Sequence, residues 1–370
     1  MFIIENYSLA VVFCFITMLC WGSWGNTQKL AGSRVWRYEL YYWDYVIGVL
    51  LLSLLAAFTM GSVGELGRGF VDDLLQADAS NLASALIGGV IFNLSNILLS
   101  ASVSIAGMSV AFPLGVGLAL VLGVFINYFN APQGSPVFLF LGVLLVIVAI
   151  VFNAWAYKNM GKGGEQQKTK GIVIAIVAGI MMSFFFRFIA SSMDLQNFEC
   201  PEVGKMTPYT AMVIFSIGIF TSNFIFNTAA MRRPFVGTPT SYGDYFAGSF
   251  RLHAVGILGG IIWGIGNLFS LLATEKAGAA ISYGLGQGAT MVAAFWGVFI
   301  WKEFVGGLPF YARCLCGNKV WIGVALSLVY IVYAMMCLPA QGFNVVSSVG
   351  AMGSILSGST IPVQSVFYYV

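Results

Sequence analysis

The sequence predicts an all-α membrane protein of ten transmembrane helices, arranged as two inverted repeats of five. Three observations predict it: an apolar composition, ten long apolar runs, and a similarity between the two halves of the chain. Hydrophobic residues make up 59% of the 370 residues and charged residues only 8%. A soluble domain has about 25% charged residues, so we expect lipid to be the solvent of this chain. The net charge of +3 does not favour nucleic acid as a partner.

Ten runs are long enough to cross a bilayer, which requires about 20 mainly apolar residues. They cover roughly 6–28, 39–60, 82–103, 108–128, 136–157, 171–192, 208–229, 253–274, 277–301 and 320–339. The longest connection, 231–252, is rich in Gly, Ser, Thr and Pro, which are typical of loops. Residues 340–370 are predicted to form a poorly ordered tail, with an eleventh short segment as the alternative.

The basic residues predict which way the helices cross the membrane. Connections after odd-numbered helices hold thirteen of them: Lys29, Arg34, Arg37, Lys158, Lys162, Lys168, Lys170, Arg232, Arg233, Arg251, Lys302, Arg313 and Lys319. The opposite side holds three: Arg68, Lys205 and Lys276. Because Lys and Arg concentrate on the cytoplasmic side, we expect both termini to lie outside the cell membrane.

The two halves resemble each other at an offset of 171 residues. Residues 88–117 align with 259–288 without a gap, and nine of thirty positions are identical, among them Asn96 with Asn267. Five helices per half is an odd number, so the second half is inverted relative to the first. We therefore divide the chain into repeats at 1–165 and 166–339 and a tail at 340–370. Inverted repeats are typical of secondary transporters, which bind substrate where the repeats meet.

Polar side chains within the spans indicate where a solute could bind, because such groups are costly in lipid. Asn96 and Asn267 lie deep in the third and eighth predicted helices, and Asn93 shares a helix face with Asn96. An amide both donates and accepts, which suits a neutral polar solute. The alternative is a hydrogen bond between helices.

Two further groups extend this predicted site. Gln287 lies between two glycines in the ninth helix, with Tyr283 one turn earlier, and glycine there loosens the backbone beside a possible cavity. Trp21 and Asn26 belong to the motif Trp21-Gly-Ser-Trp-Gly-Asn26 near the end of the first helix. These tryptophans either stack on a ring-shaped solute or belong to the interfacial belt, which we favour for Trp24.

Few charges lie within the spans. Asp44, in the second helix, can carry a proton, or it forms a cap or an ion pair near the interface with Lys29 or Arg37. Arg187, near the outer end of the sixth helix, either contacts the substrate or a counter-ion or extends to the interface. His253 begins the eighth helix, where we expect an interfacial role.

Enzyme and metal chemistry lack their usual motifs. Cys314 and Cys316 have no second cysteine pair or nearby histidine, so we expect no metal. The basic connector around Gly161 lacks the spacing of a nucleotide-binding loop. We therefore expect no enzyme activity and no cofactor.

Several of these motifs together resemble the drug/metabolite transporter superfamily. They are Trp21-Gly-Ser-Trp24 with Asn26 and Lys29, Tyr42-Trp43-Asp44-Tyr45, Gly88-Gly89 followed by Asn96, Gly259-Gly260 followed by Gly266-Asn267, and Phe295-Trp-Gly-Val-Phe299 with Glu303. The resemblance covers about residues 6–339. It lies within the branch of rhamnose and glucose/ribose porters and ureide permeases, and the pattern is most like that of ureide permeases.

The resemblance implies ten helices in two inverted repeats, a cavity lined by helices 1–4 and 6–9, and proton-linked uptake. This chain lacks the long insertion that plant ureide permeases carry between helices 5 and 6, and its tail matches no known pattern. The missing insertion favours a bacterial sugar or nucleobase-type porter.

We therefore expect a symporter that uses protons to take up a small neutral polar metabolite, either a monosaccharide or a ureide or nucleobase. A metabolite or drug exporter on the same fold is the first alternative, since a cavity lined by Met and aromatic residues favours efflux. The chain has 15 Met, 31 Phe, 16 Tyr and 9 Trp. A structural or receptor-like membrane protein is the second alternative. The sequence does not indicate the oligomeric state.

Overall fold

The described part of the chain is helical, with a single isolated β-bridge between Met193 and Met206. The computed structural model describes residues 1–32, 35–130, 136–137, 140–144, 147–148, 150–151 and 165–302. The helices are α1 Tyr7–Ser23, α2 Gly25–Ala31, α3 Tyr38–Phe58, α4 Phe70–Gln76, α5 Ala79–Ala106, α6 Met108–Asn130, α8 Glu165–Ser191, α9 Pro208–Arg232, α10 Tyr242–Phe246, α11 Phe250–Ala277, α12 Ala279–Gly286, α13 Ala289–Phe295 and the π-helix η1 Trp296–Ile300.

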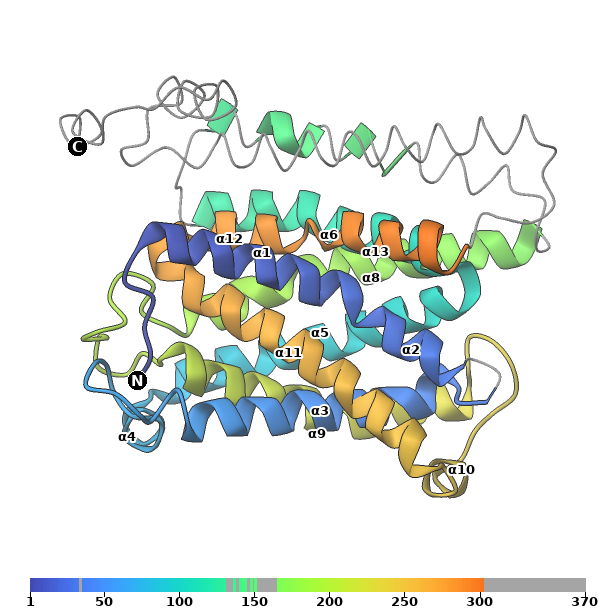
Figure 1. Ribbon diagram of the computed structural model, residues 1–370, viewed down its shortest axis with the longest axis horizontal. Helices are drawn as coiled ribbons and strands as arrows, with labels where there is room; N and C mark the ends of the chain where they lie inside the picture. Colours follow the sequence, from blue (N-terminus) through green and yellow to red (C-terminus); the bar gives the residue numbers. More distant parts are fainter. Residues whose placement is uncertain are drawn as a thin grey trace, which may run out of the picture.

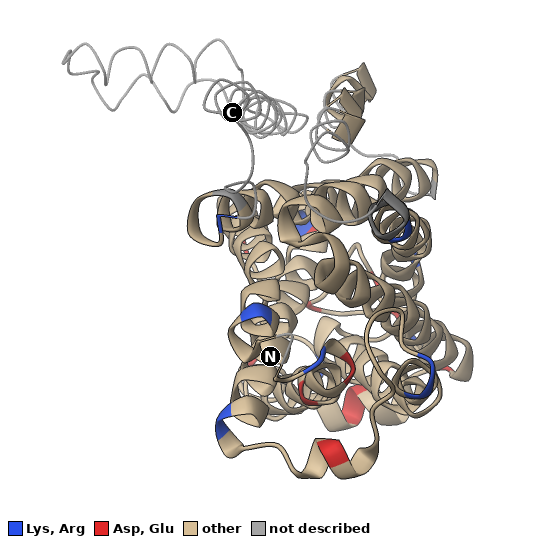
Figure 2. Cartoon of the chain, turned by 90° about the vertical axis from the view of Figure 1, so that its right-hand side faces the viewer, with Lys and Arg blue, Asp and Glu red and all other residues tan. Residues whose placement is uncertain are grey.

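Seven spans in the described residues are long and apolar enough to cross a membrane, namely Tyr7–Ala31, Tyr38–Phe58, Ala79–Ala106, Met108–Phe129, Thr169–Ser191, Pro208–Arg232 and Phe250–Ala277. They correspond to the predicted helices 1 to 4 and 6 to 8. The tenth predicted segment, 320–339, lies outside the described residues, as does much of the fifth, 136–157. Figure 2 shows how few Lys, Arg, Asp and Glu residues the helices carry.

The ninth predicted helix is not one continuous helix. It consists of α12, α13 and η1, and Gln287 and Gly288 separate the first two. This break agrees with the loosening predicted from the glycines around Gln287. The fourth predicted helix has no such break, since α6 continues through Pro113. The connections 61–81 and 231–252 also contain short helices, α4 and α10, which were not predicted.

The described connections gather at two ends of the molecule, which Figure 1 shows at left and right. At the α4 end lie the N-terminus, residues 61–78 and residues 193–207. The Arg68 guanidinium joins them there, because it bonds the Asp73 carboxylate and the backbone oxygens of Glu202 and Lys205. The α10 end holds residues 24–32, 35–37 and 231–249, where Arg37 bonds the Val236 backbone oxygen. The connections after the first and seventh predicted helices therefore share one end, and both belong to the side to which the charge pattern assigns them.

Glycines allow the closest helix contacts in the core. A Cβ at Gly89 of α5 would overlap the carbonyl oxygen of Phe215 in α9. A Cβ at Gly260 of α11 would overlap that of Tyr45 in α3. Small residues let helix backbones approach in this way when lipid provides no hydrophobic force between helices.

Gly107 and Gly278, another identical pair of the two halves, end α5 and α11. Both have a φ of 84°, which favours glycine because a Cβ is strained there. Each residue turns the chain directly into the next helix, α6 or α12. The local conformation therefore explains the identity at this pair.

Candidate functional site

A narrow cavity lies in the core between α1, α5, α6, α8, α11 and the break after α12. Its lining is mostly aromatic and aliphatic, with two amides: Trp21, Trp24, Phe92, Asn96, Leu99, Phe112, Val116, Met182, Phe185, Trp263 and Gln287. No charged side chain belongs to this lining. The cavity therefore suits an uncharged ligand with apolar faces.

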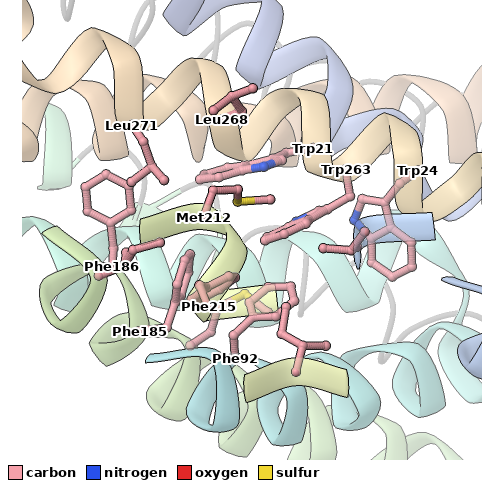
Figure 3. Packing of buried hydrophobic residues seen from close by; sticks show 14 of the residues in the cluster. Trp21, Trp24, Phe92, Phe185, Phe186, Met212, Phe215, Trp263, Leu268 and Leu271 are labelled. Atoms are coloured by element: carbon pink, nitrogen blue, oxygen red, sulfur yellow. The ribbon is translucent and has the colours of Figure 1, made fainter. Parts of the chain in front are cut away.

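Stacked rings form one wall of the cavity. The Trp21 and Trp263 indoles are nearly parallel, at 10°, with centroids 6.1 Å apart. Phe92 lies 4.2 Å from Trp263, and Phe185 meets Phe92 edge to face at 5.2 Å. Figure 3 shows these rings converging from α1, α5, α8 and α11. Flat aromatic faces favour stacking against a planar ring or the apolar face of a sugar.

The two lining amides come from α5 and from the break after α12. The Asn96 amide nitrogen donates to the Tyr42 hydroxyl over 3.3 Å. Gln287 follows the last residue of α12, and its backbone belongs to a tight turn in which the Gly288 N–H bonds the Leu285 oxygen. A helix break beside a cavity leaves backbone groups available to a ligand.

Three buried polar atoms near these rings have no hydrogen-bond partner in the described part of the chain: Trp21 Nε1, Tyr45 Oη and Asn267 Oδ1. The Tyr45 ring lies 6.4 Å from that of Trp263. Buried polar groups are nearly always paired, so such atoms indicate a site for a ligand or for water. They provide two donors and one acceptor beyond the lining amides.

The structure brings three of the predicted substrate-binding residues, Trp21, Asn96 and Gln287, into the cavity lining. Tyr283 is fully buried beside it, with its ring 6.5 Å from that of Trp21. Asn267 is buried and donates to the Met212 sulfur.

Like Tyr283 and Asn267, the remaining two predicted residues are not part of the cavity lining. Asn93 donates to Ser222 Oγ over 2.9 Å. Asn26 lies at the α10 end, where its Oδ1 accepts from the Trp301 indole over 2.6 Å. Their proposed contacts with a solute stay predictions.

The residues that sequence reasoning missed are apolar, apart from the ring nitrogens of tryptophan: Trp24, Phe92, Leu99, Phe112, Val116, Met182, Phe185 and Trp263. The interfacial interpretation of Trp24 is wrong, because the residue is 2% exposed and lies in the core. A signal existed for two others, since Phe92 and Trp263 each lie one helical turn before a paired asparagine.

Asp44 lies outside the cavity, in a buried network at the α10 end. Its Oδ1 accepts from the Tyr245 hydroxyl over 2.7 Å and from His253 Nδ1 over 2.8 Å, and its Oδ2 from the Trp36 indole over 3.3 Å. Burial raises the pKa of Tyr245, and the bond to Asp44 adds to this, so its hydroxyl stays a donor. The network joins α3, α10 and α11.

Arg37 and Arg187 are not part of this network. Arg37, which the sequence suggested as a partner of Asp44, bonds Glu39 instead. Arg187 is exposed on α8 and does not line the cavity.

Comparison with known proteins adds a family. A family model described as "Ureide permease" matches residues 41–163 and 157–308. Ureide permease 1 of Arabidopsis thaliana is 23% identical over 358 residues, which cover 82% of this chain and 92% of that protein.

Bacterial uptake proteins are also similar. A putative sugar uptake protein of Enterococcus faecalis is 21% identical, over 80% of this chain and 90% of that protein. The glucose uptake protein GlcU of Bacillus subtilis is 22% identical, over 59% of this chain and 68% of that protein. A solved crystal structure is 14% identical in sequence to this chain. The match covers 91% of this chain and 100% of that chain, with a TM-score of 0.55, and it shows similarity of fold alone.

Proposed function

This chain belongs to the ureide permease family, and from that premise we propose that it takes up a small neutral polar solute by proton-coupled alternating access. The chain is a multi-pass membrane transporter of small metabolites, and it is not an enzyme. The single observation that carries the proposal is the uncharged cavity in the core, with two amides among stacked rings.

The chemistry of the lining supports a solute class. A ureide or a nucleobase is planar, neutral and rich in amide-type donors and acceptors, which matches Asn96, Gln287 and the unpaired Trp21 N–H. A monosaccharide has an apolar face that can stack on one aromatic ring. It also has several hydroxyls, and two amides cannot provide hydrogen-bond partners for all of them. The proposed solute is therefore a ureide or nucleobase first and a monosaccharide second.

Contacts between equivalent positions support two inverted repeats. Phe92 and Trp263 are 171 residues apart, and their rings touch. Residues that are equivalent in two repeats meet only near the axis that relates the repeats. The glycine contacts are also paired, since Gly89 approaches α9 and Gly260 approaches α3. A cavity beside Phe92 and Trp263 then lies at the junction of the repeats, where transporters of this type bind solute.

Uptake by cells tests the proposed solute. Cells expressing the protein are offered labelled ureides, nucleobases and monosaccharides, with and without a protonophore, and empty-vector cells provide the control. We expect saturable uptake of one class that the protonophore abolishes. If the rate of uptake into proteoliposomes is the same with and without an imposed pH gradient, proton coupling is contradicted.

The exporter remains the second candidate, because six of the eleven lining residues are aromatic and another is Met182. A cavity of this kind also accepts flat apolar compounds. Efflux of such a compound from loaded cells, without uptake of any polar metabolite, would favour this candidate. The uptake proteins among the relatives support import.

The Asp44 network supports a place for coupling. We expect Asp44→Asn to abolish uphill accumulation of solute while exchange of solute across the membrane continues, because the amide carries no proton through the cycle. Accumulation and exchange are measured in proteoliposomes. Asp244→Asn is the control, since Asp244 is an exposed carboxylate next to Tyr245. Normal accumulation by Asp44→Asn would exclude Asp44 from coupling.

The gathering of basic residues supports an orientation with the α10 end in the cytoplasm. Cys200 is exposed in the 193–207 segment at the α4 end. We expect a membrane-impermeant maleimide to label Cys200 in intact cells, and Cys200→Ser to remove this label. If Cys200 is labelled only after the cells are broken, the α4 end lies in the cytoplasm and the proposed orientation is wrong.

A further inference from the structure

A second set of buried polar groups lies where α3, α5 and α9 meet. Five of its side-chain atoms have no hydrogen-bond partner among the residues described: Asn93 Oδ1, Asn223 Oδ1 and Nδ2, Asn227 Oδ1 and Glu39 Oε2. All four side chains are 0% exposed. Native proteins leave few such atoms unpaired, so a row of them calls for a ligand.

The row begins at the cavity. Asn96 lines the cavity and donates to the Tyr42 hydroxyl, which in turn donates to the Asn93 backbone oxygen over 3.4 Å. The Asn93 amide donates to Ser222 of α9. These bonds connect α5, α3 and α9 at the level of the cavity.

From Ser222 the row continues toward the α10 end. Asn223 and Asn227 are four residues apart and therefore share one face of α9. The Asn227 amide donates to the Glu39 backbone oxygen over 2.8 Å. Glu39 lies in the first turn of α3, and Arg37 bonds its Oε1 over 2.8 Å, which leaves Oε2 unpaired.

The chemistry of the unpaired atoms selects the ligand. Four of the five are oxygen acceptors, so the ligand has to donate. A metal cation gains little here, because Arg37 already balances the charge of Glu39. Water donates twice, accepts for the Asn223 amide nitrogen, and bridges groups that are too far apart to bond directly.

We propose that bound water molecules fill this row and form an aqueous route between the cavity and the α10 end, with Asn223 and Asn227 along it and Glu39 at its outer end. In this proposal, the route is the path that connects the cavity to the α10 end. The water itself does not depend on the proposed function, whereas its use by a solute does.

Silver ion tests the route, because it is close to water in size and binds thiols. Asn223→Cys and Asn227→Cys are made in a background in which the six native cysteines are serine. Purified protein is treated with Ag⁺, and the free thiol is then counted with a maleimide after denaturation. Ile219→Cys is the control, since Ile219 is equally buried one turn before Asn223. No substrate is required.

We expect Ag⁺ to block both route cysteines about tenfold faster than Ile219→Cys, because apolar sites stay dry. Equal rates at the three positions would overturn the proposal. Thermal unfolding of Asn223→Leu in the native background is a second measurement. If the row is dry, replacing an unpaired amide by an apolar side chain of similar size raises the midpoint. A midpoint at or below that of the wild type supports the water, and a higher midpoint overturns it.

Discussion

Gly260→Ala is expected to destabilise the fold by about 3 kcal/mol, at the upper end of the usual cost of overpacking. The added methyl would overlap the Tyr45 carbonyl oxygen and lie 2.8 Å from the Val49 nitrogen. Both are backbone atoms of α3, which cannot rotate away, so α3 and α11 have to separate. The thermal midpoint in detergent and the fraction of monodisperse protein after size-exclusion chromatography measure the loss.

Gly264→Ala is the matched control, one turn further along α11. Its methyl would meet the Leu52 Cδ2 atom at 2.7 Å, which is the end of a flexible side chain. We expect a loss of about 1 kcal/mol, because the leucine can change its rotamer. Equal losses in the two variants would show that the backbone contact between α3 and α11 is not what limits this interface.

The double variant Asn96→Ala, Gln287→Ala is expected to weaken solute binding by about 30-fold. Each amide contributes about 1 kcal/mol through a hydrogen bond to the solute, and 1.4 kcal/mol is a factor of ten in affinity. The solute found by the uptake screen provides the probe, and its dissociation constant is measured on purified protein.

Asn127→Ala is the control for the loss of a buried amide. Asn127 is 4% exposed, donates to the Gly123 oxygen of its own helix and does not line the cavity. We expect its affinity for solute to equal that of the wild type. An unchanged affinity in the double variant, with a normal thermal midpoint, would place the solute site elsewhere.

The paired asparagines show how far prediction from sequence reached. Their identity in both halves identified Asn96, which lines the cavity, and Asn267, which is buried one helical turn after the lining residue Trp263. Gln287 was found because glycines on either side predicted a break in its helix. These signals are local, since a polar residue or a glycine within an apolar run is unusual wherever it lies.

The Asp44 network and the water route were not predictable in this way. Asp44 is adjacent to aromatic residues in sequence, but its partners Tyr245 and His253 lie about 200 residues away. Asn223 and Asn227 become notable only once the structure shows that their side-chain atoms lack hydrogen-bond partners among the described residues. The partner of a polar group depends on how helices pack, which spacing along one helix does not reveal.

The sequence by itself determined that this chain crosses a membrane many times, and it predicted seven of the spans that the structure describes. A span needs only length and hydropathy, and both are properties of one segment. The tertiary structure alone decided which apolar side chains enclose the cavity. Phe215 is fully buried and Phe224 is 53% exposed on the same helix. In lipid the core-facing and solvent-facing sides of a helix are both apolar, so the periodicity that separates them in water is absent.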